Sequence, residues 1–165
     1  MVLVSRVTEH LQNQGAAFEV IPHEQTYTSI EEARALGISA GEVVKTVLVG
    51  ASSGYGLMAV PGYRRLDMRL VHQAMGDAHA RLATEEEMAR DFPDYELGAL
   101  PPLGALLNTP VYVDPEVMAH DEVVFAGGTQ TESVKMRTED VFRDGPATIV
   151  PLTRHPEEEE KDPLG

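Results

Sequence analysis

The sequence predicts a single mixed α/β domain, for three reasons. Segments with apolar residues at helical spacing occur in irregular order with short β-branched runs, which favours a mixed sheet over a plain doubly wound fold. The 165 residues match one domain in length, and 42% apolar and 24% charged residues are typical of a globular protein. No internal repeat or linker divides the chain. We therefore expect one domain over residues 1–152, followed by an acidic, disordered tail over residues 153–165.

The N-terminal third predicts two helices and three strands. Apolar residues at helical spacing predict a helix over 1–14, and a short apolar run predicts a strand over 17–21. A second helix is predicted over 29–36, because a serine and a glutamate three residues later have the spacing of a capping box. The β-branched run 43–49 predicts a strand buried on both faces, which a turn connects to a partner strand over 57–60.

The middle of the chain predicts two more helices and a rigid loop. Asp67 can cap a helix that runs to Met75, and Thr84 and Glu87 repeat the capping-box spacing at the start of another. A short strand is expected between them, over 80–83. Prolines and glycines are dense over the following segment, 93–110, which favours a fixed loop over regular structure.

The C-terminal part predicts three further strands and a short helix. Apolar runs predict the strands over 111–113, 122–125 and 133–137. The glycine pair between the last two strands is expected to form their turn, and Thr138 is expected to cap the final helix.

Charge and composition exclude several classes of protein. Thirteen Lys and Arg residues against 27 Asp and Glu give a net charge of −14, so nonspecific binding to a nucleic-acid backbone is excluded. The absence of cysteine excludes disulfides, thiolate metal sites and a cysteine nucleophile. No window approaches the roughly 18 apolar residues of a membrane helix, and the N-terminus lacks a signal-peptide pattern. We therefore expect a cytoplasmic protein that binds neither membranes nor DNA.

Lys45 is the most informative residue. The chain has only three lysines, and this one lies inside an otherwise apolar strand. Burying an ammonium group costs several kcal/mol unless it is paired or lines a cleft. Lys45 is therefore either a solvent-facing residue of an alternating strand or a cation that holds a carboxylate, a phosphate or a developing oxyanion.

Two glycine-containing loops are further candidates for a site. The segment 96–104 carries two adjacent prolines flanked by glycines, a rigid backbone that can present amides to a ligand, or else only a surface connection. The segment 125–129 pairs two glycines before a threonine and can cradle an anion in a backbone nest, or else only turn a hairpin. The six histidines lack metal-ligand spacing, and only His23, next to a strand end, is a plausible site residue.

Taken together, these segments resemble the YbaK/EbsC family, which is similar to the editing domain of bacterial prolyl-tRNA synthetases. The likeness covers nearly the whole folded chain, from about Phe18 to Val150. The matching segments follow one another in the family's order: Ile21-Pro22-His23, Leu36-Gly37, Val43–Val47, Arg81–Glu85, Phe92–Glu96, Gly98–Pro102, Val111–Asp114 and Gly127–Thr129. Family members carry an essential lysine in the valine-rich strand, at Lys45, and a glycine–three residues–proline loop, at Gly98–Pro102.

The resemblance implies a central mixed sheet curled into a partial barrel with helices packed outside. It implies an aminoacyl-tRNA deacylase, a trans-editing hydrolase that cleaves the ester of mischarged tRNA without a metal or organic cofactor. Lys45 is the implied catalytic residue, acting by electrostatic positioning. The implied partners are the acceptor end of tRNA and an aminoacyl-tRNA synthetase. The implied substrate-binding residues are His23, Thr46, Gly98, Ala99, Leu100, Pro101, Pro102, Asp114, Gly127, Gly128 and Thr129.

Two alternatives remain open from the sequence. A non-catalytic binding module of the same fold would recognise an aminoacyl-nucleotide or a synthetase partner without hydrolysis. A lysine that forms a Schiff base with a carbonyl metabolite is the second alternative, supported only by the apolar surroundings of Lys45.

Overall fold

A computed structural model describes residues 2–154. The elements in chain order are α1 (Val2–Asn13), β1 (Phe18–Pro22), α2 (Ser29–Leu36), the 3-10 helix η1 (Ala40–Glu42), β2 (Val44–Ala51), β3 (Gly54–Pro61), α3 (Met68–Met75), β4 (Arg81–Leu82), α4 (Glu85–Asp91), α5 (Gly104–Leu107), β5 (Val111–Val113), α6 (Pro115–Met118), β6 (Glu122–Thr129), β7 (Glu132–Arg137), α7 (Thr138–Val141) and β8 (Ala147–Ile149).

The strands form two sheets rather than the one central sheet that we expected. The smaller is antiparallel, in the order β1-β7-β6, and the larger is mixed, in the order β4-β2-β3-β5-β8. A single parallel bridge between Val43 and Val124 connects the start of β2 to β6. The described residues therefore form a mixed α/β domain with two linked sheets and no closed barrel.

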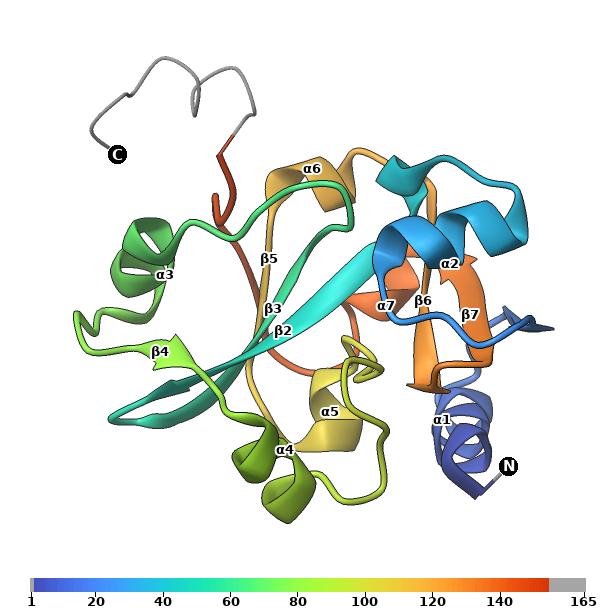
Figure 1. Ribbon diagram of the computed structural model, residues 1–165, viewed down its shortest axis with the longest axis horizontal. Helices are drawn as coiled ribbons and strands as arrows, with labels where there is room; N and C mark the ends of the chain where they lie inside the picture. The colour runs from blue at the N-terminus through green and yellow to red at the C-terminus, as the bar shows by residue number, and fades with distance from the viewer. Residues whose placement is uncertain (1, 155–165) are drawn as a thin grey trace.

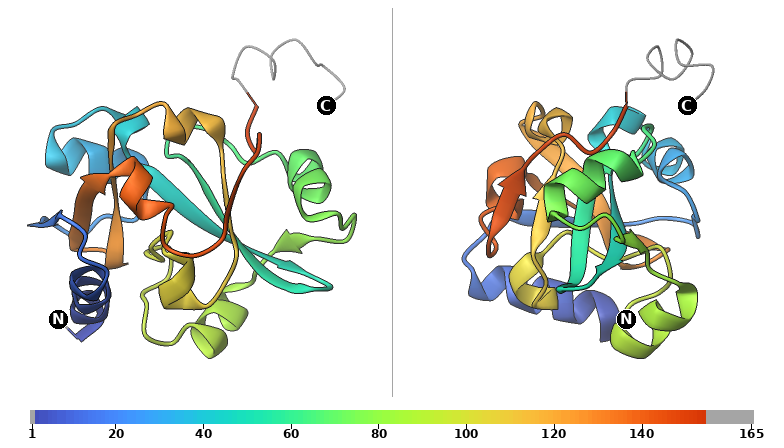
Figure 2. Two further views of the ribbon diagram at one scale, coloured as in Figure 1. Left: turned by 180° about the vertical axis from the view of Figure 1, so that it is seen from behind. Right: turned by 90° about the vertical axis from the view of Figure 1, so that its left-hand side faces the viewer.

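The strands β2 and β3 separate two hydrophobic cores, as expected for a strand buried on both faces. Figure 1 shows this pair crossing the centre of the molecule, and Figure 2 shows α1 and α3 at opposite ends. The larger core contains Val44 and Leu48 of β2 together with residues of α1, β6 and β7. The smaller core contains Val49 and packs against α3. Alternation along β2 thus sends even-numbered residues to one core and odd-numbered residues to the other.

Two of the four predicted helix caps are confirmed. The Asp67 carboxylate accepts a hydrogen bond from the Arg69 amide at the start of α3. Thr84 and Glu87 form the reciprocal capping box of α4.

The capping box predicted for α2 is wrong. Thr28, not Ser29, is the N-cap, and its hydroxyl accepts from the Glu31 amide at 3.1 Å. Glu32 turns into the protein and makes no capping bond. The predicted end at Gly37 is confirmed, because this residue has the left-handed conformation of a Schellman-type cap (φ +68°).

Three predictions for the C-terminal half also need correction. Gly127 and Gly128 lie within β6, and the turn to β7 falls at Gln130 and Thr131. The segment 93–110, predicted as a loop, contains the short helix α5. Thr138 is the first residue of α7 rather than its N-cap, and its hydroxyl donates to the His120 carbonyl. The strand β8 was not predicted.

The C-terminal segment is held on the domain through Arg154. The Asp114 carboxylate is 3% exposed and accepts from the amides of Leu152 and Thr153 and from the Thr153 hydroxyl. Arg154 pairs with Asp67 at 2.9 Å. Thr153 and Arg154, at the start of the predicted tail, therefore contact the domain, and the rest of that tail, 155–165, lies outside the described residues. Between residues 2 and 154, every helix is too short or too polar to cross a membrane.

Candidate active site

Lys45 lines a cleft of about 340 Å³ at the start of β2. The walls come from the segment before α2, from β2 itself and from the loop at Gly98 and Leu100. Gly62 completes the wall, because a Cβ at this position would lie 2.4 Å from the Ser29 Cβ, so only glycine lets the start of α2 approach the end of β3. Lys45 is the only basic residue, and Glu32 the only acidic one, among the described residues of this lining.

Partial burial shapes the chemistry of Lys45. Desolvation, and secondarily the positive charge of Arg65, lower the pKa of the Lys45 ammonium below its usual value. Within the described part of the chain, neither Lys45 nor Arg65 has a carboxylate within ion-pair distance. The ammonium is therefore available to an anionic ligand or to charge that develops during a reaction.

Among the described residues, the edge of β2 that faces this cleft is paired only near its two ends, by the single bridge between Val43 and Val124 and by β4. The strand β4 contacts β2 only at Val49 and Gly50, where the Leu48 carbonyl also accepts from Ala83. Backbone groups of alternate residues point to the same side of a strand, so those of Thr46 point toward the open edge. The Thr46 hydroxyl is one of two buried side-chain polar atoms without a hydrogen-bond partner among the described residues. The wall of the cleft thus contains an enclosed polar side-chain atom without a partner, next to backbone groups that point toward the open part of the edge.

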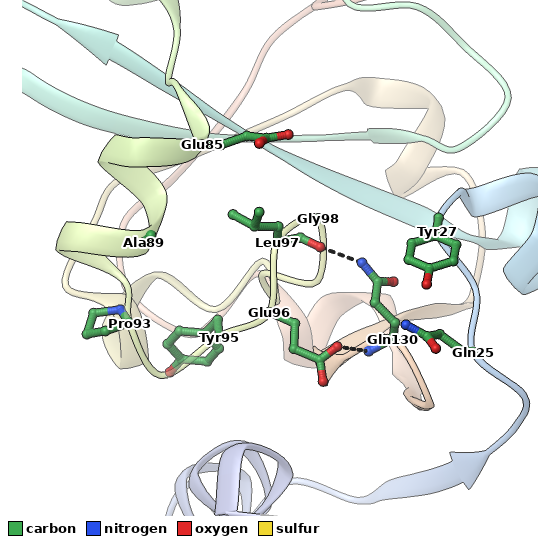
Figure 3. A pocket seen from close by; sticks show the side chains of 10 residues that line it. All are labelled: Gln25, Tyr27, Glu85, Ala89, Pro93, Tyr95, Glu96, Leu97, Gly98 and Gln130. Atoms are coloured by element: carbon green, nitrogen blue, oxygen red, sulfur yellow. Dashed lines mark hydrogen bonds between the residues drawn. The ribbon is translucent and has the colours of Figure 1, made fainter.

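The Gly98 loop is fastened to the turn after β6 by Gln130. The Gln130 side-chain amide donates to the Leu97 carbonyl at 2.5 Å, and its backbone amide donates to the Glu96 carboxylate at 3.1 Å, as Figure 3 shows. Gly98 has φ +77°, and a Cβ there would lie 3.2 Å from the Gln130 nitrogen. Tyr27, Gly98 and Gln130 line both this cleft and a more open one of about 670 Å³ beside α4. The fastened loop therefore forms the partition between two adjoining clefts.

A chain of hydrogen bonds connects His23 to Glu32 beneath the cleft. The His23 Nε2 lies 2.8 Å from the hydroxyl of Ser133, which is fully buried and donates to the Glu32 carboxylate. Burial raises the pKa of Glu32, while the Ser133 bond and the charge of His23 act in the opposite direction. Because the serine lies between the histidine and the carboxylate and has no exposure, this is not a nucleophilic Ser-His-acid triad.

The structure places only part of the predicted site on this cleft. Lys45, Thr46, Gly98 and Leu100 line it. The predicted residues that do not line it are His23, Ala99, Pro101, Pro102, Asp114, Gly127, Gly128 and Thr129.

Two of these residues have other bonds that explain their positions. The Gly128 amide donates to the Ala99 carbonyl at 3.0 Å, so it is occupied and cannot serve as the oxyanion donor of a nest. Asp114 is a structural acceptor for the C-terminal segment, as described above. Both residues therefore have structural bonds within the fold, in addition to their predicted place at the substrate.

Sequence reasoning missed Glu32 and Gln130. The spacing of Glu32 from Ser29 suggested a helix cap, and only the contact with Ser133, 101 residues away, reveals its inward orientation. Gln130 gave no local signal beyond its place next to the glycine pair. Across residues 2–154, no group of three or more histidine or acidic side chains is arranged to hold a metal ion.

Comparisons with known proteins agree with this geometry. A proline–tRNA ligase from Thermosipho melanesiensis is 27% identical over 106 residues, which cover 64% of this chain and 18% of the ligase. The chain thus spans less than a fifth of that relative. Two solved structures are similar over nearly their whole length. The first is of a candidate trans-editing enzyme for prolyl-tRNA synthetase, with 27% identity and a TM-score of 0.84 over 94% of this chain and 99% of the other. The second is of a hypothetical protein, with 26% identity and a TM-score of 0.80 over 90% of this chain and 99% of the other.

A family model for the aminoacyl-tRNA editing domain matches residues 23–143, which include β2, the Gly98 loop and the strands β6 and β7. The matched segment is most of the folded chain, and it contains both walls of the cleft. The resemblance noted from the sequence is thereby confirmed: this chain belongs to the aminoacyl-tRNA editing domain family.

Proposed function

We propose that this protein is an aminoacyl-tRNA deacylase that hydrolyses the ester of mischarged tRNA in trans. The observation that carries the proposal is the position of Lys45, the only cation among the described residues of a cleft that the Gly98 loop and an open strand edge enclose. A half-buried ammonium without a carboxylate partner is suited to stabilise negative charge in a site of reduced polarity.

The proposed reaction is attack of water, or of a group on the substrate, on the ester carbonyl. The aminoacyl group occupies the cleft under Gly98 and Leu100. As the carbonyl carbon becomes tetrahedral, its oxygen gains negative charge, and the Lys45 ammonium stabilises it. Collapse of the intermediate formed by water breaks the ester bond and releases the amino acid, and the proton that the water loses passes to the terminal ribose oxygen. If a side chain of the substrate attacks instead, the acyl group leaves as a cyclic product, which water then opens. Lys45 acts in this scheme by charge and position and forms no covalent bond.

The Thr46 amide is the proposed second oxyanion donor. Gly128 is unsuitable because its amide is bonded to Ala99. The Thr46 amide belongs to the residue next to Lys45, and alternation along β2 directs it to the open part of the edge. Ammonium and amide would then approach the carbonyl oxygen from adjacent residues of one strand.

Binding of tRNA by a protein with a net charge of −14 needs local positive charge. Arg65 is exposed and close enough to Lys45 to lower its pKa, so the two form a local cationic site for the phosphates of the acceptor end. A synthetase partner would supply further attraction. The substrate implies the cytoplasm as the place of action.

The test is a deacylation panel with alanyl-, cysteinyl-, seryl- and prolyl-tRNA. We expect wild-type turnover of at least one ester, and Lys45→Ala to lower kcat/KM about 100- to 1000-fold, the usual effect of losing one oxyanion-stabilising group. Lys135→Ala is the matched control, because Lys135 lies on β7 outside the cleft lining and its loss changes the net charge equally. Normal turnover by Lys45→Ala contradicts the mechanism, and no turnover of any ester by wild type favours a non-catalytic binding module.

A further inference from the structure

Glu32 is a buried carboxylate that the proposed reaction does not use. It is 6% exposed, lies on the inward face of α2 and lines the same cleft as Lys45. Tying α2 to β7 would not require a charge, since a glutamine could accept the Ser133 hydrogen bond equally well. The cost of burying a carboxylate therefore points to a use for its charge.

Only one of the two Glu32 oxygens is engaged within the protein. Oε2 accepts from the Ser133 hydroxyl, whereas Oε1 has no hydrogen bond to any described residue. Oε1 is also not among the enclosed polar atoms that lack a partner, which are Thr46 Oγ1 and Arg64 Nε. Oε1 therefore remains accessible, and the accessible space next to Glu32 is the cleft.

Proton positions along the chain from His23 are consistent with an anionic Glu32. The His23 Nδ1 lies 2.7 Å from the Glu24 carbonyl, so it is the protonated nitrogen of that contact. The Ser133 hydroxyl donates to Glu32, so its proton points to the carboxylate and its oxygen lies 2.8 Å from His23 Nε2. Glu32 thus accepts this hydrogen bond as a carboxylate, and the charge of His23 favours that form by lowering the pKa of Glu32.

Among the described residues of the lining, Glu32 is the one acidic group and Lys45 the one basic group, so the cleft has an anionic pole and a cationic pole. The two poles are not an ion pair, since no contact within 4.0 Å joins them, so a ligand can lie between them. An aminoacyl ester has matching groups, an α-ammonium on one side of the carbonyl carbon and the ester oxygens on the other. Ile30, Val44 and Leu100 leave an apolar space between for a small side chain.

We propose that Glu32 Oε1 binds the α-ammonium group of the aminoacyl substrate, with Ser133 and His23 as positioning residues that hold the carboxylate. The inference rests on the proposed deacylase function and defines its substrate class as esters with a free α-amino group. N-blocked esters, such as N-acetylaminoacyl-tRNA, would be poor substrates, because an amide nitrogen offers no positive charge to the carboxylate.

The experiment compares alanyl-tRNA with N-acetyl-alanyl-tRNA on wild type and on Glu32→Gln. We expect wild type to prefer the free amine about 10- to 100-fold in kcat/KM, the range of one hydrogen bond to a charged group. Glu32→Gln should lose this preference by slowing on alanyl-tRNA alone. A preference that came only from the bulk of the acetyl group would persist in the variant and would overturn the inference.

Glu31→Gln is the matched control, since Glu31 is the exposed neighbour on α2, is absent from the cleft lining and carries the same charge. It should retain the wild-type preference, and an equal loss in both variants would show a general charge effect and count against Glu32.

A binding measurement separates this inference from the proposed function. Calorimetry with 3′-alanylamino-3′-deoxyadenosine and its N-acetyl form needs no turnover. Selective binding of the free amine by wild type, lost in Glu32→Gln, supports the role of Glu32 even if no ester is hydrolysed. Equal or absent binding of the two analogues by wild type overturns it even if esters are hydrolysed.

Discussion

Replacing Asp114 tests whether this buried carboxylate holds the fold together or contacts substrate. Its Oδ2 accepts from the Leu152 amide at 2.9 Å, the Thr153 amide at 3.1 Å and the Thr153 hydroxyl at 3.0 Å. Its Oδ1 accepts from the Glu116 amide at 3.0 Å, which caps α6. Asp114 therefore joins the end of β5 to α6 and to the C-terminal segment.

The magnitude follows from these four bonds. A hydrogen bond to a charged group contributes about 1.5–3 kcal/mol, and an unpaired buried donor costs about 1–3 kcal/mol. The three bonds at Oδ2 share one atom, so their contributions do not add. We expect Asp114→Ala to lower the free energy of unfolding by about 3–5 kcal/mol. Asp114→Asn can keep its oxygen toward Leu152 and Thr153 and lose only the helix cap, which costs about 1–2 kcal/mol.

The assay is urea denaturation together with deacylation measured well below the unfolding transition. Asp121→Asn is the control, because this aspartate is exposed and should change stability by less than about 0.5 kcal/mol. Both Asp114 variants should retain wild-type activity per folded molecule. Wild-type stability combined with lost deacylation would refute this reasoning and would return Asp114 to the substrate site.

Two further predictions concern the loop and the buried carboxylate. Gly98→Ala and Gly76→Ala both place alanine at a positive φ, +77° and +65°, so each variant should lose about 1 kcal/mol of stability. Only Gly98→Ala should also lose deacylation activity, because its Cβ meets the Gln130 side chain. Equal activity of the two variants would contradict the role of the Gly98 loop as a partition between the clefts. Burial raises the pKa of Glu32 above 4.5, so the folded state binds this proton more tightly than the unfolded state. The resulting stability is present below pH 4.5 and is lost as the pH rises toward the folded-state pKa. The stability of Glu32→Gln relative to wild type should therefore rise from about pH 4 to about pH 7 in urea titrations, and a constant difference would count against a raised pKa.

Local sequence patterns correctly predicted most helices and strands whose ends are fixed by hydrogen bonds between residues close in sequence. The caps at Asp67 and Thr84 were correct because each side chain bonds an amide two or three residues away. The valine-rich strand was correct because both of its faces meet apolar cores. The missed strand β8 is exposed along its three residues and is defined by its parallel pairing with β5, so its own sequence carries no signal of burial.

Only those residues of the candidate site that are unusual within their own segment could be predicted from the sequence. Lys45 and Gly98 stood out because a cation in an apolar strand and a glycine beside a proline pair are unusual in themselves. The glycine pair was misplaced because an irregularity between Ala126 and Thr129 and bonds from the 96–99 loop continue β6 past it. Glu32 was misread because its partner lies on a strand from the other end of the chain.

The part of the β2 edge between its contacts with β6 and β4 has a consequence for association between molecules. A free strand edge is a template for adding a strand from another copy, which is a common route to aggregation. Here the Gly98 loop and the segment before α2 line the cleft of about 340 Å³ at that edge. Under the proposed deacylase function, variants that widen the cleft for larger amino acids would also expose more of this edge. Selection for a broader substrate range would therefore be opposed by self-association of the protein.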